Sequence, residues 1–270
     1  MSTEKEIQEQ FSGFLSTPLL WENRDRFGLE QYAIINEQSS VFKRIIKPNL
    51  PLGKRVEVFL SHLLHNDTKL NSISENIQIQ REKRTLGELD FIFNDNESSI
   101  HLEVVYKFYL LDINAGKTDL EQWVGPNRKD SLSLKIEKLR TKQLPRLHLP
   151  ETASLLQEKG FNQKKMKQYV HFQAQLFVPF GFKKSSFQNI NPECINGFYI
   201  SLNQLREFRN CEFYIPSKVN WLIDPTLERE FIGYEEFEEK VVSYLNQKRS
   251  PLCWLKDENN HLSKFFIVWW

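Results

Sequence analysis

The chain has 270 residues, of which 36 are Lys or Arg and 35 are Asp or Glu, so its formal net charge is +1. Its 21 Phe, 8 Tyr and 6 Trp exclude a disordered chain, and its 10 Gly and 11 Pro exclude a collagen-like or low-complexity one. A net charge this close to zero argues against a protein that coats nucleic acid through bulk positive charge, but it allows a local basic surface.

Cysteine usage and hydropathy indicate where such a chain would reside. Cys194, Cys211 and Cys253 are far apart, which is typical of free thiols in a reducing compartment rather than of a disulfide framework or a zinc site. The N-terminal residues are charged where a signal peptide is apolar, and the apolar stretches at 102–105 and 265–270 are far shorter than the roughly 20 residues that span a bilayer. We therefore expect a cytoplasmic protein with no membrane partner.

The first 52 residues are predicted to form a helical extension. A helix is expected around residues 29–41, and Pro18 and Pro48 mark breaks in the chain. The remainder is divided into a core at 53–180 and a β-rich region at 181–270 that packs on the core.

An amphipathic helix is predicted directly after Pro51 and Gly53. Its apolar residues recur at i, i+3, i+4, i+7 and i+8, which is the spacing of one helix face. They are Val56, Phe59, Leu60, Leu63 and Leu64. Glu57 lies about 100° from the centre of that stripe, at its edge.

Three strands are predicted next, because apolar and polar residues alternate there with a period of two. They lie at about residues 76–80, 88–94 and 101–108. Asn94–Asp95–Asn96 is good turn chemistry, so the second and third strands are expected to form a hairpin.

A second helix is predicted from about Ser131, with Asp130 or Ser131 as its cap and Leu132, Ile136 and Leu139 on its apolar face. A fourth strand follows at 169–179. The β-rich remainder is expected to hold strands near 198–202, 211–216, 252–256 and 264–270 and an acidic helix near 234–247. The predicted class is therefore α/β, with the order helix, three strands, helix, strand.

The polar faces of the second and third strands carry the candidate chemistry. Asp90 and Glu103 lie on neighbouring strands, which run about 4.8 Å apart. Two carboxylates in one site suit Mg²⁺, or Mn²⁺ in its place, because such a hard cation is held by one or two carboxylates, waters and substrate phosphates. Lys107 could position the attacking water, and Glu57 could reach the site from the first helix. Alternating charged and apolar residues are, however, also typical of a solvated sheet face.

His101 lies on the same face of its strand as Glu103. We expect it to be a surface histidine, and a role as an additional base or ligand is the alternative.

Three segments and the basic helix after them resemble a known bacterial family. The segments are TLGELDFIF (85–93), HLEVVYKFYL (101–110) and WVGPNRKD (123–130). Their arrangement is similar to domain-of-unknown-function family 1853, which is grouped with the PD-(D/E)XK nuclease superfamily. The resemblance is strongest over about residues 50–145. It implies a restriction-endonuclease-like core of helix, three strands, helix and strand around a mixed sheet, which agrees with the order predicted from the residue pattern.

The resemblance also implies roles for individual residues. Carried over to this sequence, the metal-binding acids fall on Asp90 and Glu103, the catalytic lysine on Lys107, and the first-helix acid of many members on Glu57. Lys135 and Lys138 fall where basic or amide side chains of the second helix support such sites.

One spacing departs from the superfamily pattern. The second acid and the lysine are four residues apart instead of two, which is about 13 Å rather than about 6.7 Å between Cα atoms of a strand. Both spacings keep the two side chains on one face. The function implied is therefore Mg²⁺-dependent hydrolysis of the phosphodiester bonds of a nucleic acid. The alternative is a catalytically inactive nuclease-like fold that binds nucleic acid or acts as a scaffold.

Charge is unevenly distributed along the chain. Residues 128–167 contain 11 Lys or Arg against 4 Asp or Glu, whereas residues 224–240 contain 7 acidic and 2 basic residues. The basic segment could neutralise a phosphate backbone, although a lysine-rich helix is also typical of a solvated face. The residues expected to bind nucleic acid, with DNA favoured over RNA, are Arg128, Lys135, Lys138 and Lys142.

Gly116–Lys117–Thr118 matches the end of a phosphate-binding P-loop. That loop also requires a glycine five residues before Gly116, where this chain has Leu111. A nucleotide triphosphatase is therefore a remote third alternative.

Overall fold

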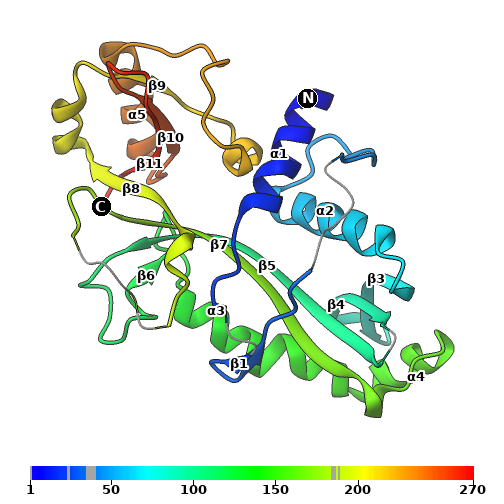
Figure 1. The fold of residues 1–270 in the computed structure, drawn as a ribbon. Coiled ribbons are helices and arrows are strands. Elements are labelled where there is room, and N and C mark those ends of the chain that lie inside the picture. The colour runs from blue at the N-terminus through cyan, green and yellow to red at the C-terminus, as the bar shows by residue number, and fades with distance from the viewer. Residues whose placement is uncertain (1, 23–24, 35–40, 96, 184–186, 188) are drawn as a thin grey trace. The chain divides into compact units, whose positions relative to one another are not determined.

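The computed structural model describes residues 2–22, 25–34, 41–95, 97–183, 187 and 189–270 (Figure 1). The helices are α1 (Glu4–Ser16), α2 (Leu52–Asn66), α3 (Leu132–Lys138), α4 (Pro150–Glu158) and α5 (Tyr234–Asn246). The strands are β1 (Asp25–Arg26), β2 (Leu29–Glu30), β3 (Asn71–Arg81), β4 (Arg84–Asn94), β5 (Ser99–Leu111), β6 (Trp123–Val124), β7 (Lys167–Pro179), β8 (Ile195–Ser201), β9 (Glu212–Tyr214), β10 (Leu252–Lys256) and β11 (Leu262–Val268).

The long strands form one mixed sheet in the order β3-β4-β5-β7-β8-β11-β10-β9, with β6 paired to β5 and the short β1 and β2 apart from it. Pairing is antiparallel between β3 and β4 and between β4 and β5, and it is parallel between β7 and β8 and between β8 and β11. The predicted α/β class is therefore confirmed.

The chain divides into two compact units. The first contains residues 1–18, 107–134 and 174–270, and the second contains residues 19–106 and 135–173. Each unit has a hydrophobic cluster of its own. Phe213, Phe237 and Phe265 belong to the cluster of the first unit, and Ile79, Leu89 and Leu147 belong to that of the second. Among the described residues, no helix has the length and hydropathy that crossing a membrane requires.

Helix α2 forms as its sequence pattern predicts. It begins after Pro51, and its stripe of Val56, Phe59, Leu60 and Leu64 is at most 1% exposed. Glu57 lies beside the stripe and is half-buried. The helix therefore turns an acid toward the edge of its packed face.

Strands β4 and β5 form the predicted hairpin. Their register pairs Phe91 with Leu102 and Phe93 with Ile100. At the turn, the Asp95 carboxylate accepts hydrogen bonds from the backbone N–H groups of Glu97 and Ser98. Asn96 lies outside the described residues.

The second predicted helix begins where expected, with the Ser131 hydroxyl accepting a hydrogen bond from the Leu134 N–H. Its regular part ends at Lys138, and a π-helical turn over Leu139–Gln143 follows. Because a π turn uses more residues per turn than an α-helix, it changes which side chains share a face.

The prediction of a helix at residues 29–41 is wrong for the described residues 29–34, which are not helical. Leu29–Glu30 forms β2, and the Tyr32 N–H donates to the Val170 carbonyl of β7. Residues 35–40 lie outside the described part. The helix of the extension is α1 instead, which starts with a capping box in which the Thr3 and Glu6 side chains each accept the other's backbone N–H.

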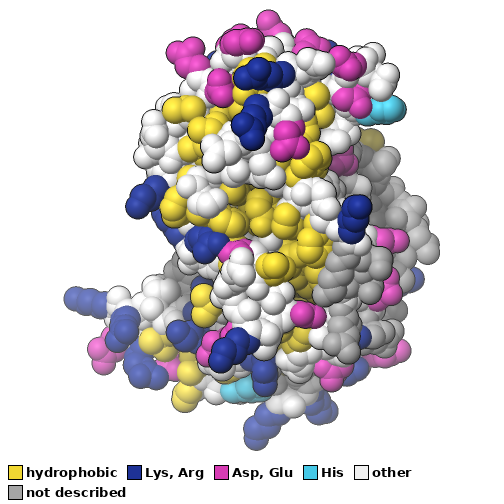
Figure 2. All heavy atoms as spheres, turned by 90° about the vertical axis from the view of Figure 1, so that its left-hand side faces the viewer, with side chains coloured by type: hydrophobic (Ala, Val, Ile, Leu, Met, Phe, Trp, Pro, Cys, Tyr) yellow, Lys and Arg dark blue, Asp and Glu magenta, His cyan; other side chains and the backbone are white. Residues whose placement is uncertain are grey.

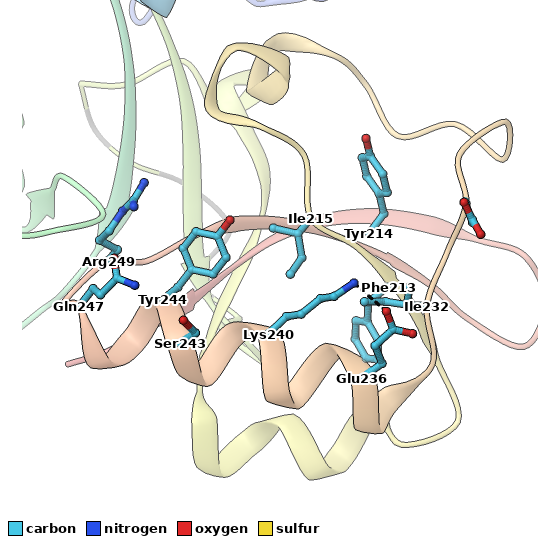
Figure 3. Close-up of a pocket in the computed structure, with 11 residues that line it drawn as sticks. Phe213, Tyr214, Ile215, Ile232, Glu236, Lys240, Ser243, Tyr244, Gln247 and Arg249 are labelled. Carbon is cyan, nitrogen blue, oxygen red and sulfur yellow. Dashed lines mark hydrogen bonds and ion pairs between the residues drawn. The ribbon is translucent and has the colours of Figure 1, made fainter.

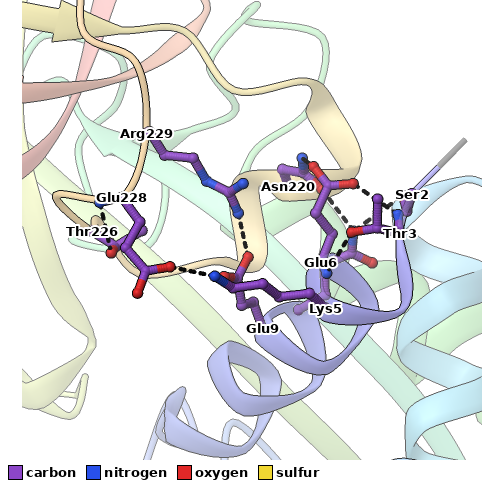
Figure 4. A network of polar contacts seen from close by, with 10 residues as sticks. Ser2, Thr3, Lys5, Glu6, Glu9, Asn220, Thr226, Glu228 and Arg229 are labelled. Carbon is purple, nitrogen blue, oxygen red and sulfur yellow. Dashed lines mark hydrogen bonds and ion pairs between the residues drawn. The ribbon is translucent and has the colours of Figure 1, made fainter.

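Helix α1 is bound to the C-terminal part of the first unit (Figure 4). Arg229 pairs with Glu9, and Lys5 pairs with Glu228. Asn220 donates to Glu6 at 3.0 Å. The start of the chain is therefore part of this unit rather than a separate extension.

Candidate active site on strands β4 and β5

Asp90 and Glu103 come together as the sequence predicts. The ladder of β4 and β5 pairs Phe91 with Leu102, and one further step along each strand places Asp90 across from Glu103. At this step Asp90 does not continue the ladder in the regular way. Its Oδ2 instead accepts a hydrogen bond of 2.9 Å from the backbone N–H of Val104. The two acids therefore lie on the same face of the sheet.

The pKa of Asp90 responds to its burial and to the charge of Glu103. Burial, followed by the charge of Glu103 and more weakly that of Glu57, raises the pKa of Asp90 to about 7, while the Val104 bond and Lys54 oppose the shift. A carboxyl with this pKa is about half protonated at neutral pH. Burial is the largest cause of this rise, and the negative charge of Glu103 adds to it.

Helix α2 contributes an acid and a cation to this site. Lys54 donates to Glu57 at 2.6 Å, to Glu88 at 2.7 Å and to Asn76 at 3.0 Å. Burial raises the pKa of Glu57, and the bond to Lys54 opposes that rise. Burial lowers the pKa of Lys54, but its bonds to Glu57 and Glu88 outweigh this and raise it overall. Glu57 is therefore in the predicted place, and Lys54 is a cation that the sequence pattern did not indicate.

Glu103 is completely buried, with 0% exposure. His101 Nε2 lies 3.1 Å from its Oε1, and the Gln143 side-chain N–H₂ donates to its Oε2. His101 is also 0% exposed, so the expectation of a surface histidine is wrong. A buried carboxylate requires such partners, because an unpaired charge in the core is costly.

The π turn explains how Gln143 reaches this position. Lys135 Nζ donates to Gln143 Oε1 at 2.6 Å, across eight residues. In a regular α-helix eight residues pass two full turns by about 80°. The wider turn over Leu139–Gln143 removes that offset and places both side chains on one face. Lys135 thus contacts the Gln143 amide, which in turn donates to Glu103.

Lys107 lies in the first unit, where its ammonium group donates to Asp130 at 2.6 Å. The loop that carries Asp130 folds closely on itself, because a Cβ at Gly125 would lie 2.0 Å from Asp130 Oδ1.

The basic segment contributes exposed cations to the second unit. Lys138, Arg140 and Lys142 are exposed, and no ion pair joins them to any of the described residues. Arg146 lies against β4, since a Cβ at Gly87 would be 2.2 Å from its Nε. Figure 2 shows Lys and Arg side chains gathered in the lower part of the face that it views.

Arg128, the fourth residue predicted to bind nucleic acid, belongs to the first unit. Its guanidinium group pairs with Asp112 and lies 4.0 Å from the centre of the Trp270 ring. These contacts hold the side chain in one position within that unit.

Gly116–Lys117–Thr118, which resembles the end of a P-loop, forms a loop closed by one of its own side chains. The backbone N–H groups of Lys117 and Thr118 donate to the Glu121 carboxylate at 2.9 and 3.0 Å. These donors, which a phosphate would need, are therefore occupied by a residue of the same loop.

The side chains of the site supply only some of the ligands that a divalent cation needs. The described residues contain no group of three or more His, Cys, Asp or Glu side chains that could hold a metal ion. Asp90 and Glu103 supply two carboxylates, which is sufficient for Mg²⁺ when water and phosphate complete its coordination.

A cavity of about 740 Å³ lies in the first unit between α5 and the segment around β9 (Figure 3). Lys240 and Glu236 pair at one end of it, and Arg249 lies at the other. Its lining balances two acids, Glu230 and Glu236, against these two cations. This balance indicates no particular ligand.

Three comparisons with known proteins show which family the chain resembles. No curated protein matches the chain, and no solved structure matches it. A family model described as "Domain of unknown function (DUF1853)" matches residues 18–268, which is nearly the whole chain and includes every residue of the site on β4 and β5. The chain therefore belongs to the DUF1853 family.

Proposed function

We propose that this protein is a metal-dependent nuclease with a restriction-endonuclease-like core of the PD-(D/E)XK type. The observation that carries the proposal is the position of Asp90 and Glu103 on neighbouring strands, where burial and the charge of Glu103 raise the pKa of Asp90 to about 7. The order α2, β3, β4, β5, α3, β7 supports the same core.

Asp90 and Glu103 would hold Mg²⁺ or Mn²⁺. When bound, the cation would lower the pKa of a coordinated water and offset the charge that develops on the phosphate. Glu103 supports this role because its two oxygens accept one bond each from His101 and Gln143. Each oxygen keeps a lone pair for another partner.

Lys54 is the cation that we assign to the phosphate at this site. Its ammonium group contacts Glu57 and Glu88, and its charge acts on Asp90. A lysine beside two metal-binding acids can bind a non-bridging phosphate oxygen and stabilise its developing charge. Lys107 lies in the first unit, where its half-exposed ammonium group pairs with Asp130.

The exposed basic residues of the same unit support a nucleic acid as the substrate. Lys138 and Lys142 have no ion-pair partner among the described residues, so their charges are available to backbone phosphates. We favour DNA over RNA, as the resemblance to the nuclease superfamily implies.

The test is hydrolysis of single-stranded, double-stranded and branched DNA and of RNA by purified protein with Mg²⁺ or Mn²⁺. We expect cleavage of at least one of these substrates. Asp90→Asn and Glu103→Gln should each lower the rate by about 10²-fold or more because they weaken the proposed metal site, and Lys54→Met should do so because it removes a positive charge at the phosphate. Lys69→Met, at an exposed lysine just after α2, is the matched control and should leave the rate unchanged.

A second candidate is a nuclease-like protein that binds nucleic acid, or acts as a scaffold, without cleaving it. It is favoured by the lack of a group of three metal-binding side chains among the described residues. Calorimetric titration with Mn²⁺ separates the two candidates. A saturable site that is lost in Asp90→Asn supports the nuclease, whereas salt-sensitive DNA binding without any metal site supports the scaffold.

A further inference from the structure

A chain of hydrogen bonds leads from Glu103 through the second unit to its surface. His101 Nε2 lies 3.1 Å from Glu103 Oε1, and His101 Nδ1 lies 3.0 Å from Gln168 Nε2. The same Gln168 nitrogen donates to the Leu144 carbonyl at 2.7 Å. His148, which is exposed, contacts Gln168 Oε1 at 3.3 Å.

The Leu144 carbonyl determines the orientation of the Gln168 amide. A backbone carbonyl only accepts hydrogen bonds, so the side-chain atom 2.7 Å from it must be the amide nitrogen. A flipped amide would bring two acceptor oxygens together at that distance. The second N–H of this nitrogen then points to His101 Nδ1, which must be an acceptor.

This orientation determines the tautomer of His101. A neutral imidazole has one donor and one acceptor nitrogen. With Nδ1 as the acceptor from Gln168, the proton lies on Nε2, and Nε2–H donates to Glu103 Oε1. His101 and Glu103 are both 0% exposed, so water does not replace this bond.

We propose that His101 is a positioning residue for Glu103, and that Gln168 sets its Nε2–H tautomer so that the Glu103 carboxylate stays fixed beside Asp90. The Leu144 carbonyl thus orients the Gln168 amide, the amide orients the His101 ring, and the ring orients the Glu103 carboxylate. This proposal rests on the proposed function, because it takes Glu103 to be a ligand of the metal ion. Outer-shell partners of this kind change metal affinity by about 10- to 100-fold.

Two substitutions at the same position test the role of Nε2. A glutamine places its amide nitrogen near the position of Nε2, whereas an asparagine reaches only the position of Nδ1. His101→Gln should therefore retain Mn²⁺ affinity within about threefold, and His101→Asn should lower it at least tenfold by calorimetry without substrate. Both variants remove the ring from the same buried position, and their side chains differ by one methylene group, so unfolding by urea is measured for both to show the part that packing contributes. Equal affinities of the two variants would overturn the proposal.

Gln168→Leu tests the origin of the tautomer. In the wild-type protein the ring ¹⁵N shifts of neutral His101 should show a protonated Nε2 and an unprotonated Nδ1, and this signature should be lost in Gln168→Leu. Gln163→Leu is the matched control, because the Gln163 amide donates to the Leu147 and Leu149 carbonyls and not to a histidine. A wild-type ring protonated on Nδ1 would overturn the proposal.

The outcomes separate this inference from the proposed function. Mn²⁺ binding with the expected difference between His101→Gln and His101→Asn, but without cleavage of any nucleic acid, contradicts the nuclease and leaves the positioning role intact. Cleavage with equal metal affinity in the two variants contradicts only the positioning role. A wild-type protein that binds no Mn²⁺ contradicts both.

Discussion

At the scale of single residues, the raised pKa of Asp90 makes the stability of the protein depend on pH. Its pKa is about 7 in the folded protein, against 3.8 for an unperturbed aspartate. The folded state therefore binds the proton more tightly than the unfolded state, and stability falls as the pH rises from about 4 to 7. Above pH 7 the full cost is present, at most about 4 kcal/mol for a shift of this size.

We expect Asp90→Asn to stabilise the metal-free protein at pH 8 and to have little effect below pH 4. The amide is neutral at every pH, and its oxygen can still accept the bond from Val104. Urea unfolding at pH 4, 6 and 8 measures the difference in the free energy of unfolding. Asp119→Asn, in a turn of the first unit, serves as the control and should show no such trend. A variant that is destabilised at pH 8 would contradict the raised pKa of Asp90, which burial and the charge of Glu103 cause.

At the scale of secondary-structure elements, α1 depends on one close approach. A Cβ at Gly13 would lie 1.9 Å from the Leu222 carbonyl oxygen, so the helix packs directly on the backbone of residues 218–222. Leu222 is itself buried, and the neighbouring Asn220 bonds Gln10 at 2.7 Å. No side chain fits at Gly13 without movement of one of the two segments.

Gly13→Ala should therefore destabilise the protein by about 1–3 kcal/mol, even though alanine favours a helix by about 1 kcal/mol relative to glycine. Gly53→Ala is the matched control in α2, where nothing lies within 4 Å of the added Cβ. That variant should be neutral or stabilising by up to about 1 kcal/mol. Thermal and urea unfolding of both variants measure the difference. Similar stabilities would show that α1 is not held by this contact.

The same scale shows why some of the fold was predictable. Helix α2 and the β4–β5 hairpin follow the local periods of their sequences, so Glu57, Asp90 and Glu103 were assigned correctly to their faces. Lys54, Gln143 and Gln168 were missed because their roles depend on contacts between distant elements. A π turn sets the position of Gln143, and no local pattern predicts it. Similarly, Leu29–Glu30 pairs with β1 and Tyr32 bonds to Val170 of β7, and these partners override the helical pattern of residues 29–34.

At the scale of the whole molecule, opposite charges separate along the chain although the net charge is only +1. Lys138, Arg140 and Lys142 are exposed in the second unit, which also contains Asp90 and Glu103. The acidic helix α5 belongs to the first unit, and its Lys240 is paired with Glu236. A polyanion should therefore contact the second unit through its basic surface.

This charge separation predicts a specific salt dependence of DNA binding. Each phosphate contact contributes about 0.9 to the slope of log affinity against log salt concentration for double-stranded DNA. A Lys138→Gln/Lys142→Gln variant should lower that slope by about 1.8 and weaken binding at low salt, because two backbone contacts and their released counterions are lost. Fluorescence anisotropy between 50 and 200 mM salt measures it. Lys240→Gln removes a surface lysine from the acidic helix and should leave the slope unchanged. An unchanged slope in the double variant would show that nucleic acid does not bind along this segment.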